Sequence, residues 1–236
     1  MNTMRLICLT YAGGNKYSYR NFMPYLSEHI EMITLELPGR GTRMLEDLIT
    51  DLDVLTDDLF RQMQAYLDKD YVLFGHSMGA MLGNLLLHKL RDEQQRLPQL
   101  FIATGCPSPE KRGLKTKIAQ LSNAAFQQEI IKLGGMPDEV IQNQELLDFV
   151  LPVLRSDIKA IETKVYEQNT PYPVPIKAFC GTEETTKEAD LTGWQLETSK
   201  EFSFEFLEGD HFFILNHLEK ITEIINNYSV EKPVVL

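Results

Sequence analysis

The stretch that most constrains the fold of this chain is residues 71–80, which read Tyr-Val-Leu-Phe-Gly-His-Ser-Met-Gly-Ala. An apolar run typical of a buried strand leads into Gly-x-Ser-x-Gly and then directly into a helical pattern. This order predicts a nucleophile elbow, a tight strand-to-helix turn that presents a serine hydroxyl above the edge of a sheet. Gly75 and Gly79 leave room for the turn because they have no Cβ, and Ser77 is expected in a strained backbone conformation. Ser77 is therefore the candidate nucleophile.

Strand-like and helical patterns alternate along the first part of the chain. Apolar runs of strand length lie at residues 4–9, 32–37, 71–76 and 99–104, and helical patterns lie at residues 17–30, 51–67 and 78–95. Two more strand-like runs, at residues 176–180 and 201–207, precede a closing helical pattern at residues 214–228. This alternation predicts an α/β fold with a mostly parallel central sheet and helices on both faces.

Between the fourth and fifth strands the pattern changes. Residues 107–170 contain helical periodicity and loops but no strand-like run, and the sheet pattern then resumes. We therefore expect a helical lid inserted over the strand ends, so that residues 1–106 and 171–236 form the two parts of one core and residues 107–170 form the lid. A chain of 236 residues is long enough to bury such a core.

A serine hydroxyl needs a base to take its proton, and an α/β hydrolase carries its triad in the chain order serine, acid, histidine. Among the five histidines, His29, His88 and His217 fall on predicted helices, and His76 belongs to the elbow. Only His211 follows the last strand in a loop. The sequence therefore predicts His211 as the base.

The acid has more than one candidate. It is expected just after the strand that ends at Cys180, where Glu183, Glu184, Glu188 and Asp190 follow. Glu184 is favoured because it lies close to the strand end, where a carboxylate can reach the imidazole Nδ1 and stabilise the imidazolium. Asp190 stays an alternative, although an acidic residue at a helix start is also typical of a cap.

The oxyanion hole of such an enzyme consists of two backbone amides. One is predicted at Met78, directly after the nucleophile, and the other in the loop after the first strand, at Ala12 or Tyr11. These donors would stabilise the charge that develops on a tetrahedral acyl intermediate. The predicted reaction class is therefore acyl transfer, usually to water.

Composition excludes several other classes of function. The net charge of −11 argues against a nucleic-acid partner. There is no run of about 18 apolar residues that could span a membrane, and the first residues lack the features of a signal peptide, so we expect a cytoplasmic protein. Cys8, Cys106 and Cys180 cannot all pair with one another and are expected as buried apolar residues in a reducing compartment. No cluster of Cys and His has metal-ligand spacing, so no metal site is expected.

Several further motifs, spread over nearly the whole chain, match those of one known protein family. They are Tyr-Ala-Gly-Gly at residues 11–14, Leu-Pro-Gly-Arg at 37–40, Gly-His-Ser-Met-Gly-Ala at 75–80, Leu-Gly-Gly-Met-Pro at 133–137 with Glu-Val at 139–140, Leu-Pro-Val-Leu-Arg-Ser-Asp at 151–157, and Gly-Asp-His-Phe-Phe at 209–213. With these motifs the chain resembles the type II, or external, thioesterases that accompany nonribosomal peptide and polyketide synthases.

This resemblance implies an α/β-hydrolase fold with a helical lid and the hydrolysis of acyl thioesters on the phosphopantetheine arm of a carrier protein. It implies an editing role, in which stalled or wrong acyl groups are removed, and no cofactor of the enzyme's own. Ser77 and His211 match the nucleophile and the base. The family has Gly-x-x-Asp after the fifth strand, whereas Gly181-Thr182-Glu183-Glu184 places a glutamate in that position.

Two rival functions remain open from the sequence: a soluble carboxylesterase or lipase-like hydrolase of free esters, and a non-catalytic module that binds carrier proteins. The expected partners are acyl or peptidyl carrier protein domains, and the chain is expected to be a monomer. Because carrier proteins tend to be acidic, Lys111, Arg112, Lys115 and Lys117 form a candidate docking patch. We refer to these four residues as the basic patch.

Overall fold

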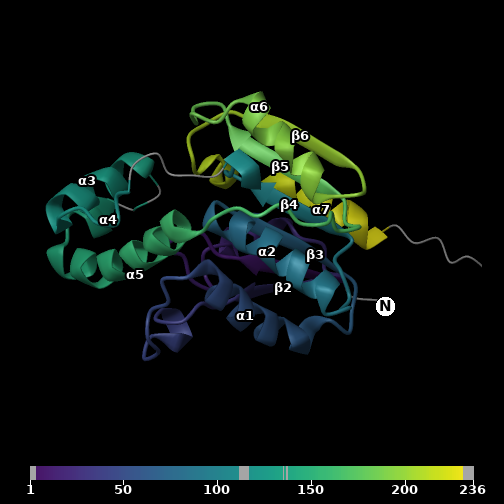
Figure 1. Ribbon diagram of the computed structural model, residues 1–236, viewed down its shortest axis with the longest axis horizontal. Coiled ribbons are helices and arrows are strands. Elements are labelled where there is room, and N and C mark those ends of the chain that lie inside the picture. Colours follow the sequence, from purple (N-terminus) through teal and green to yellow (C-terminus); the bar gives the residue numbers. More distant parts are fainter. Residues whose placement is uncertain (1–3, 112–116, 135, 137, 231–236) are drawn as a thin grey trace, which may run out of the picture.

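Six parallel strands form one sheet in the computed structural model, which describes residues 4–111, 117–134, 136 and 138–230 (Figure 1). The strands are β1 (Met4–Leu9), β2 (Ile30–Leu35), β3 (Tyr71–His76), β4 (Leu100–Thr104), β5 (Ile176–Gly181) and β6 (Phe202–Leu207). They lie in the order β2-β1-β3-β4-β5-β6, and each pairs in parallel with its neighbour. All six predicted strands are confirmed, and the fold is that of an α/β hydrolase.

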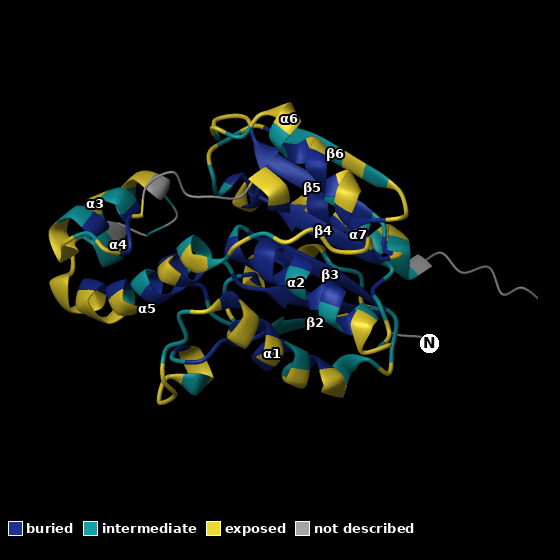
Figure 2. Ribbon diagram, in the orientation of Figure 1, coloured by how far each residue is buried: buried dark blue, intermediate teal, exposed yellow. Residues whose placement is uncertain are grey.

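Each face of the sheet is buried under its own layer. Because side chains alternate along a strand, Ile7 and Leu9 join one apolar cluster while Leu6 and Cys8 join the other. The first cluster is covered by α1 (Leu52–Met63) and α2 (Met78–Asp92), and the second by α7 (Leu218–Val230) and the 3₁₀ helix η1 (Arg20–Tyr25). Figure 2 shows the inner strands β1, β3, β4 and β5 as buried, the edge strands β2 and β6 as only partly buried, and the outer faces of the helices as exposed. Burial on both faces explains why the central strands read as continuous apolar runs.

The described residues between β4 and β5 include three α-helices that lie together beside the sheet, at the left of Figure 1. They are α3 (Asn123–Leu133), α4 (Asp138–Ile141) and α5 (Gln144–Thr163). They share an apolar cluster that includes Phe126, Ile130, Leu147, Leu151, Leu154 and Ile158. Asn143 begins α5, since its Oδ1 accepts hydrogen bonds from the amides of Glu145 and Leu146. The division of the chain into core and lid stays a prediction.

The prediction of a helix at residues 17–30 is wrong. The segment forms turns and the short helix η1, and His29 lies in a turn just before β2. Asn15 Oδ1 accepts a hydrogen bond from the Tyr17 amide, and Ser18 Oγ accepts one from the Asn15 amide, so local side chains compete with a helical ladder. Pro24 also lacks an amide hydrogen to donate.

The other helical elements are short and span three to six residues each. They are η2 (Gly41–Arg43), η3 (Gln64–Tyr66), η4 (Pro109–Lys111), α6 (Glu188–Leu191), η5 (Thr192–Glu197) and η6 (Phe213–Leu215). His217 precedes α7 instead of lying inside it, and its Nε2 lies 2.8 Å from the Glu208 carbonyl oxygen. Among the helices in the described part of the chain, none combines the length and the apolar character needed to cross a bilayer.

Candidate active site

Ser77 occupies the turn between β3 and α2 with φ 54° and ψ −115°. A positive φ is uncommon for a residue with a side chain, so the strained backbone expected at the elbow is present. The Ser77 amide donates a 2.8 Å hydrogen bond to the Thr104 carbonyl oxygen at the end of β4. The surrounding sheet thus holds this conformation in place.

Two glycines make this turn possible. A Cβ at Gly75 would lie 2.3 Å from the carbonyl oxygen of Gly79, and a Cβ at Gly79 would lie 2.2 Å from the carbonyl oxygen of Leu9. Both distances are far below van der Waals contact, so a larger residue would force the backbone apart. The first turn of α2 therefore packs directly against the end of β1, where the predicted oxyanion loop begins.

His211 and Glu184 come together at the carboxyl end of the sheet. His211 Nδ1 lies 2.8 Å from Glu184 Oε2, a distance at which an imidazole N–H donates to a carboxylate. The other carboxylate oxygen, Oε1, accepts from the Gly181 amide at 3.1 Å and from the Cys180 thiol at 3.3 Å. The carboxylate is thus fixed against the end of β5 and faces the histidine.

The other acid candidate, Asp190, lies at the start of α6. Its Oδ2 accepts a 2.8 Å hydrogen bond from the Lys187 amide, which is the cap contact that its position in the sequence suggested. The carboxyl end of β5 also lies very close to the loop that carries His211, since a Cβ at Gly181 would lie 2.3 Å from the Asp210 carbonyl oxygen. This approach brings the loop of Glu184 next to His211.

His76 is a part of the site to which the sequence assigned no role beyond the elbow. Its side chain is fully buried, its Nδ1 lies 2.9 Å from Thr104 Oγ1, and its ring centroid lies 4.9 Å from that of His211. Burial, followed by the nearby His211, holds the pKa of His76 well below its usual range, so this ring is neutral. The contact places His211 beside the residue that precedes Ser77. Within the described residues, the side-chain hydrogen bond of His211 is to Glu184, and the Ser77 hydroxyl makes none to His211.

The predicted oxyanion donors lie at the start of α2 and in the loop after β1. In the part of the chain that the structure describes, the amides of Ala12 and Met78 donate no hydrogen bond. The Gly14 amide donates to the Tyr11 carbonyl oxygen at 2.8 Å, and Gly13 has a φ of 77°, so residues 11–14 form a tight turn. Both candidate amides are available to a ligand.

A cavity of about 370 Å³ opens beside this turn. Its walls combine the turn, Phe212 next to His211, and apolar side chains of the helical segment between β4 and β5. Those apolar side chains are Ile130, Met136, Val140, Val150 and Leu154. Asn15, Ser18 and Arg20 also line the cavity, so its lining is partly apolar and partly polar.

Part of the basic patch, Arg112 and Lys115, lies outside the described residues. Lys111 Nζ lies 3.7 Å from Glu110 Oε1, and Lys117 is exposed. No group of three or more His, Cys, Asp or Glu side chains within the described ranges could hold a metal ion.

The chain is similar in sequence and in fold to several known proteins. The chain is 31% identical over 94% of its length to linear gramicidin dehydrogenase LgrE of Brevibacillus parabrevis, of which it covers 86%. It superimposes with a TM-score of 0.90 on ClbQ from the colibactin NRPS/PKS pathway, at 29% identity with 96% of each chain covered. The type II thioesterase BorB from the borrelidin cluster gives a TM-score of 0.88 at 28% identity, with 96% of this chain and 93% of BorB covered.

The name of LgrE denotes a dehydrogenase, but this chain has no Gly-x-Gly-x-x-Gly turn after a strand for a dinucleotide. Its Gly-His-Ser-Met-Gly elbow is instead the motif of a serine hydrolase. The model of the thioesterase domain family matches residues 4–228, which includes the elbow, both members of the His211–Glu184 pair and the helical segment. The chain therefore belongs to the thioesterase family and is a thioesterase of the type II kind found in nonribosomal peptide and polyketide pathways.

Proposed function

We propose that this thioesterase edits a nonribosomal peptide or polyketide synthase by hydrolysing acyl groups from the phosphopantetheine arm of carrier proteins. The observation that carries the proposed site is the 2.8 Å contact between His211 and Glu184, set beside an elbow that presents Ser77. The pathway in which ClbQ acts supports carrier-bound thioesters as the substrate. Three buried free cysteines fit a cytoplasmic enzyme, which we expect to act as a monomer.

In this proposal the acyl group passes through Ser77. His211 Nε2 takes the hydroxyl proton while Ser77 Oγ attacks the thioester carbonyl carbon, and the carbon–sulfur bond then breaks. His211 returns the proton to the departing pantetheine sulfur. A water molecule next attacks the acyl-enzyme and gives its proton to His211, which passes it to Ser77 Oγ as the carboxylic acid leaves. No cofactor takes part in these steps.

Glu184 and the backbone amides stabilise the charges that appear on the way. Glu184 holds the Nδ1–H tautomer of His211 and stabilises the imidazolium after proton transfer. The amides of Met78 and Ala12 donate to the oxyanion, and the positive end of α2 adds to the same effect. The 370 Å³ cavity receives the acyl chain, because its apolar wall begins at the oxyanion turn.

Hydrolysis of a short acyl group from a carrier protein tests the proposal. Wild type should release the acid, and Ser77→Ala should lose nearly all of this rate, about 10³-fold or more. Ser203→Ala is the matched control, because Ser203 is exposed on β6 and should leave the rate unchanged. Equal rates for wild type and Ser77→Ala would contradict the proposal.

Two further measurements address the rival functions. A higher kcat/KM for an oxygen ester than for the carrier thioester of the same acyl chain would favour a carboxylesterase. A fluorophosphonate probe that fails to label Ser77 would favour a non-catalytic carrier-binding module.

A further inference from the structure

The turn after β1 is held by a residue of helix α5. The Gly13 amide donates a 2.8 Å hydrogen bond to Asp157 Oδ2, although the two residues stand 144 positions apart. Arg40 donates to the same carboxylate with both terminal nitrogens, at 2.6 Å to Oδ2 and 2.7 Å to Oδ1. Asp157 is fully buried and Arg40 is 4% exposed. This cluster joins the loop after β1, the loop after β2 and the helical segment.

Apolar packing brings α5 to the same place. Leu154 stands one turn before Asp157, on the same face of the helix. A Cβ at Gly13 would lie 2.6 Å from Leu154 Cδ2, so the helix rests directly on the turn. Ser156 Oγ also donates a 2.9 Å hydrogen bond to the Ile49 carbonyl oxygen. The contacts of Leu154, Ser156 and Asp157 therefore dock the middle of α5 onto the core.

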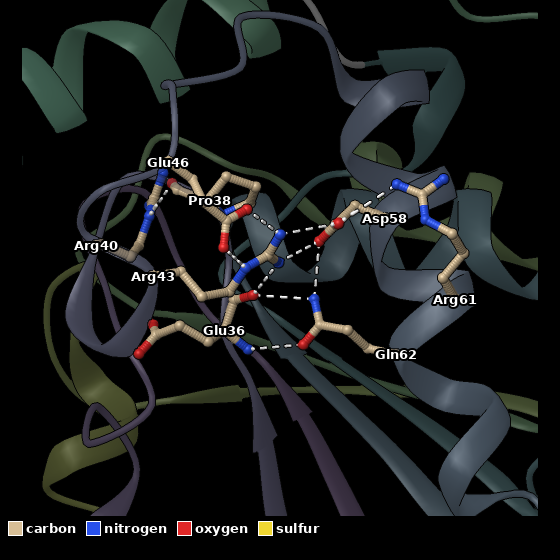
Figure 3. A network of polar contacts seen from close by, with 8 residues as sticks. All are labelled: Glu36, Pro38, Arg40, Arg43, Glu46, Asp58, Arg61 and Gln62. Carbon is tan, nitrogen blue, oxygen red and sulfur yellow. Dashed lines mark hydrogen bonds and ion pairs between the residues drawn. The ribbon is translucent and has the colours of Figure 1, made fainter.

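The loop that carries Arg40 is itself held firmly by its neighbours. Arg43 donates to the Glu36 carbonyl oxygen at 2.9 Å and binds Asp58, and Gln62 bonds both of the same groups (Figure 3). The Glu36 side chain then accepts from the Lys16 amide at 3.1 Å, on the far side of the turn. Two buried carboxylates thus hold the chain after β1, that of Asp157 at Gly13 within the turn and that of Glu36 at Lys16 just after it.

We propose that Asp157 is a positioning residue for the oxyanion hole, and that through it the docking of α5 is a requirement for catalysis. The Gly13 amide that Asp157 binds belongs to the peptide unit next to the Ala12 donor. Arg40 holds the carboxylate in one orientation, so the turn is set before substrate arrives and no reorganisation is needed in the transition state. This inference rests on the proposed function, because it assigns Asp157 to the same site.

Asp157→Asn is the direct test, since it keeps the shape of the side chain and removes the charge that Arg40 binds. We expect kcat for a small free acyl thioester to fall about ten- to hundredfold, less than the roughly 10²- to 10³-fold effect of losing an oxyanion donor outright, while KM changes less than about threefold. Rates are expressed per active site titrated with a fluorophosphonate. A kcat per titrated site within about twofold of wild type would overturn the inference.

The matched control is Glu197→Gln. Glu197 is also a buried carboxylate with two partners, since His88 Nε2 lies 2.8 Å from its Oε2 and the Tyr166 hydroxyl donates to its Oε1 at 2.9 Å. It belongs to η5, and these two partners lie outside the turn. Glu197→Gln should lower stability but leave kcat per titrated site unchanged, and an equal fall in kcat for both variants would overturn the inference.

Arg40→Lys provides a second variant that keeps the positive charge, in case Asp157→Asn fails to fold. It should lose less kcat than Asp157→Asn, because one charged hydrogen bond can still form. The affinity for a boronic acid that forms a tetrahedral adduct at Ser77 should fall in proportion to kcat in both variants. An unchanged boronate affinity in Arg40→Lys together with a wild-type kcat would contradict the proposed role.

The labelling rate of Ser77 separates failure of this inference from failure of the proposed function. If wild type hydrolyses acyl thioesters but Asp157→Asn is labelled at the wild-type rate, the inference fails and the proposed function stands. If wild type hydrolyses no acyl thioester while Asp157→Asn still slows labelling, the inference stands and the proposed substrate class fails.

Discussion

Glu184 Oε2 lies 2.8 Å from His211 Nδ1, although α6, η5 and β6 separate the two residues in the chain. The resembling family has an aspartate at this position, and a glutamate side chain is one methylene longer. The extra length is taken up close to the strand, where Oε1 accepts from the Gly181 amide and the Cys180 thiol. The carboxylate therefore reaches the imidazole from a fixed position.

Replacing Glu184 with glutamine should lower kcat about 10³- to 10⁴-fold, because an amide neither holds the required His211 tautomer nor stabilises its imidazolium. Steady-state hydrolysis of an acyl thioester measures the effect. Asp190→Asn is the control: it weakens the cap of α6 and should cost about 1 kcal/mol of stability with kcat within about threefold of wild type. A larger loss of kcat in Asp190→Asn than in Glu184→Gln would show that Glu184 is not the acid.

Gly181→Ala should reduce both stability and activity. Its Cβ would lie 2.3 Å from the Asp210 carbonyl oxygen, so the histidine loop must move away from β5. We expect a loss of roughly 1–3 kcal/mol in the free energy of unfolding, measured with denaturant, and a lower kcat per folded molecule. Lys177→Ala, on the same strand, should change kcat little. Wild-type kcat in Gly181→Ala would show that the close approach does not set the position of His211.

His76 should make the protein less stable as the pH falls. Burial holds the pKa of His76 in the folded protein below its usual range. Below about pH 6.5 the unfolded chain therefore binds a proton that the folded protein does not bind. Stability is full above this pH and declines below it, with a slope of up to about 1.4 kcal/mol per pH unit from this one group.

The variant His76→Asn measures this contribution. Its free energy of unfolding should change less between pH 7 and pH 5 than that of wild type, and the difference between the two curves isolates this histidine from the other four. Parallel curves would mean that His76 does not cause the decline.

Reversing the charges of the basic patch to glutamate should raise KM for a carrier-bound acyl group several-fold at low salt. The reason is that charges at the edge of an interface mainly affect the rate of association with an acidic partner. A small free thioester should be affected little. The same change at the exposed Lys200 serves as the control. If both substrates respond alike to reversal of the patch, carrier proteins dock elsewhere.

The six strands and the elbow could be predicted from the sequence because their signals are local. A strand buried on both faces must be apolar along its length, as Tyr71 to Phe74 are, and few other structures accommodate such a run before Gly-x-Ser-x-Gly. Ser77 and His211 follow from chain order at the ends of these strands. The helix prediction at residues 17–30 failed because the apolar spacing there fits a helix, whereas Asn15, Ser18 and Pro24 favour turns.

By itself, the sequence determined the six strands, the serine at the elbow and the histidine in the last loop, since each follows from local patterns and from their order along the chain. Only the tertiary structure decided which carboxylate faces His211 and which residue holds the turn after β1. Glu184 and Asp190 both follow β5, but Glu184 contacts His211 whereas Asp190 caps α6. Asp157 reaches Gly13 from another part of the chain, and no local pattern encodes a contact that exists only once α5 packs on the sheet.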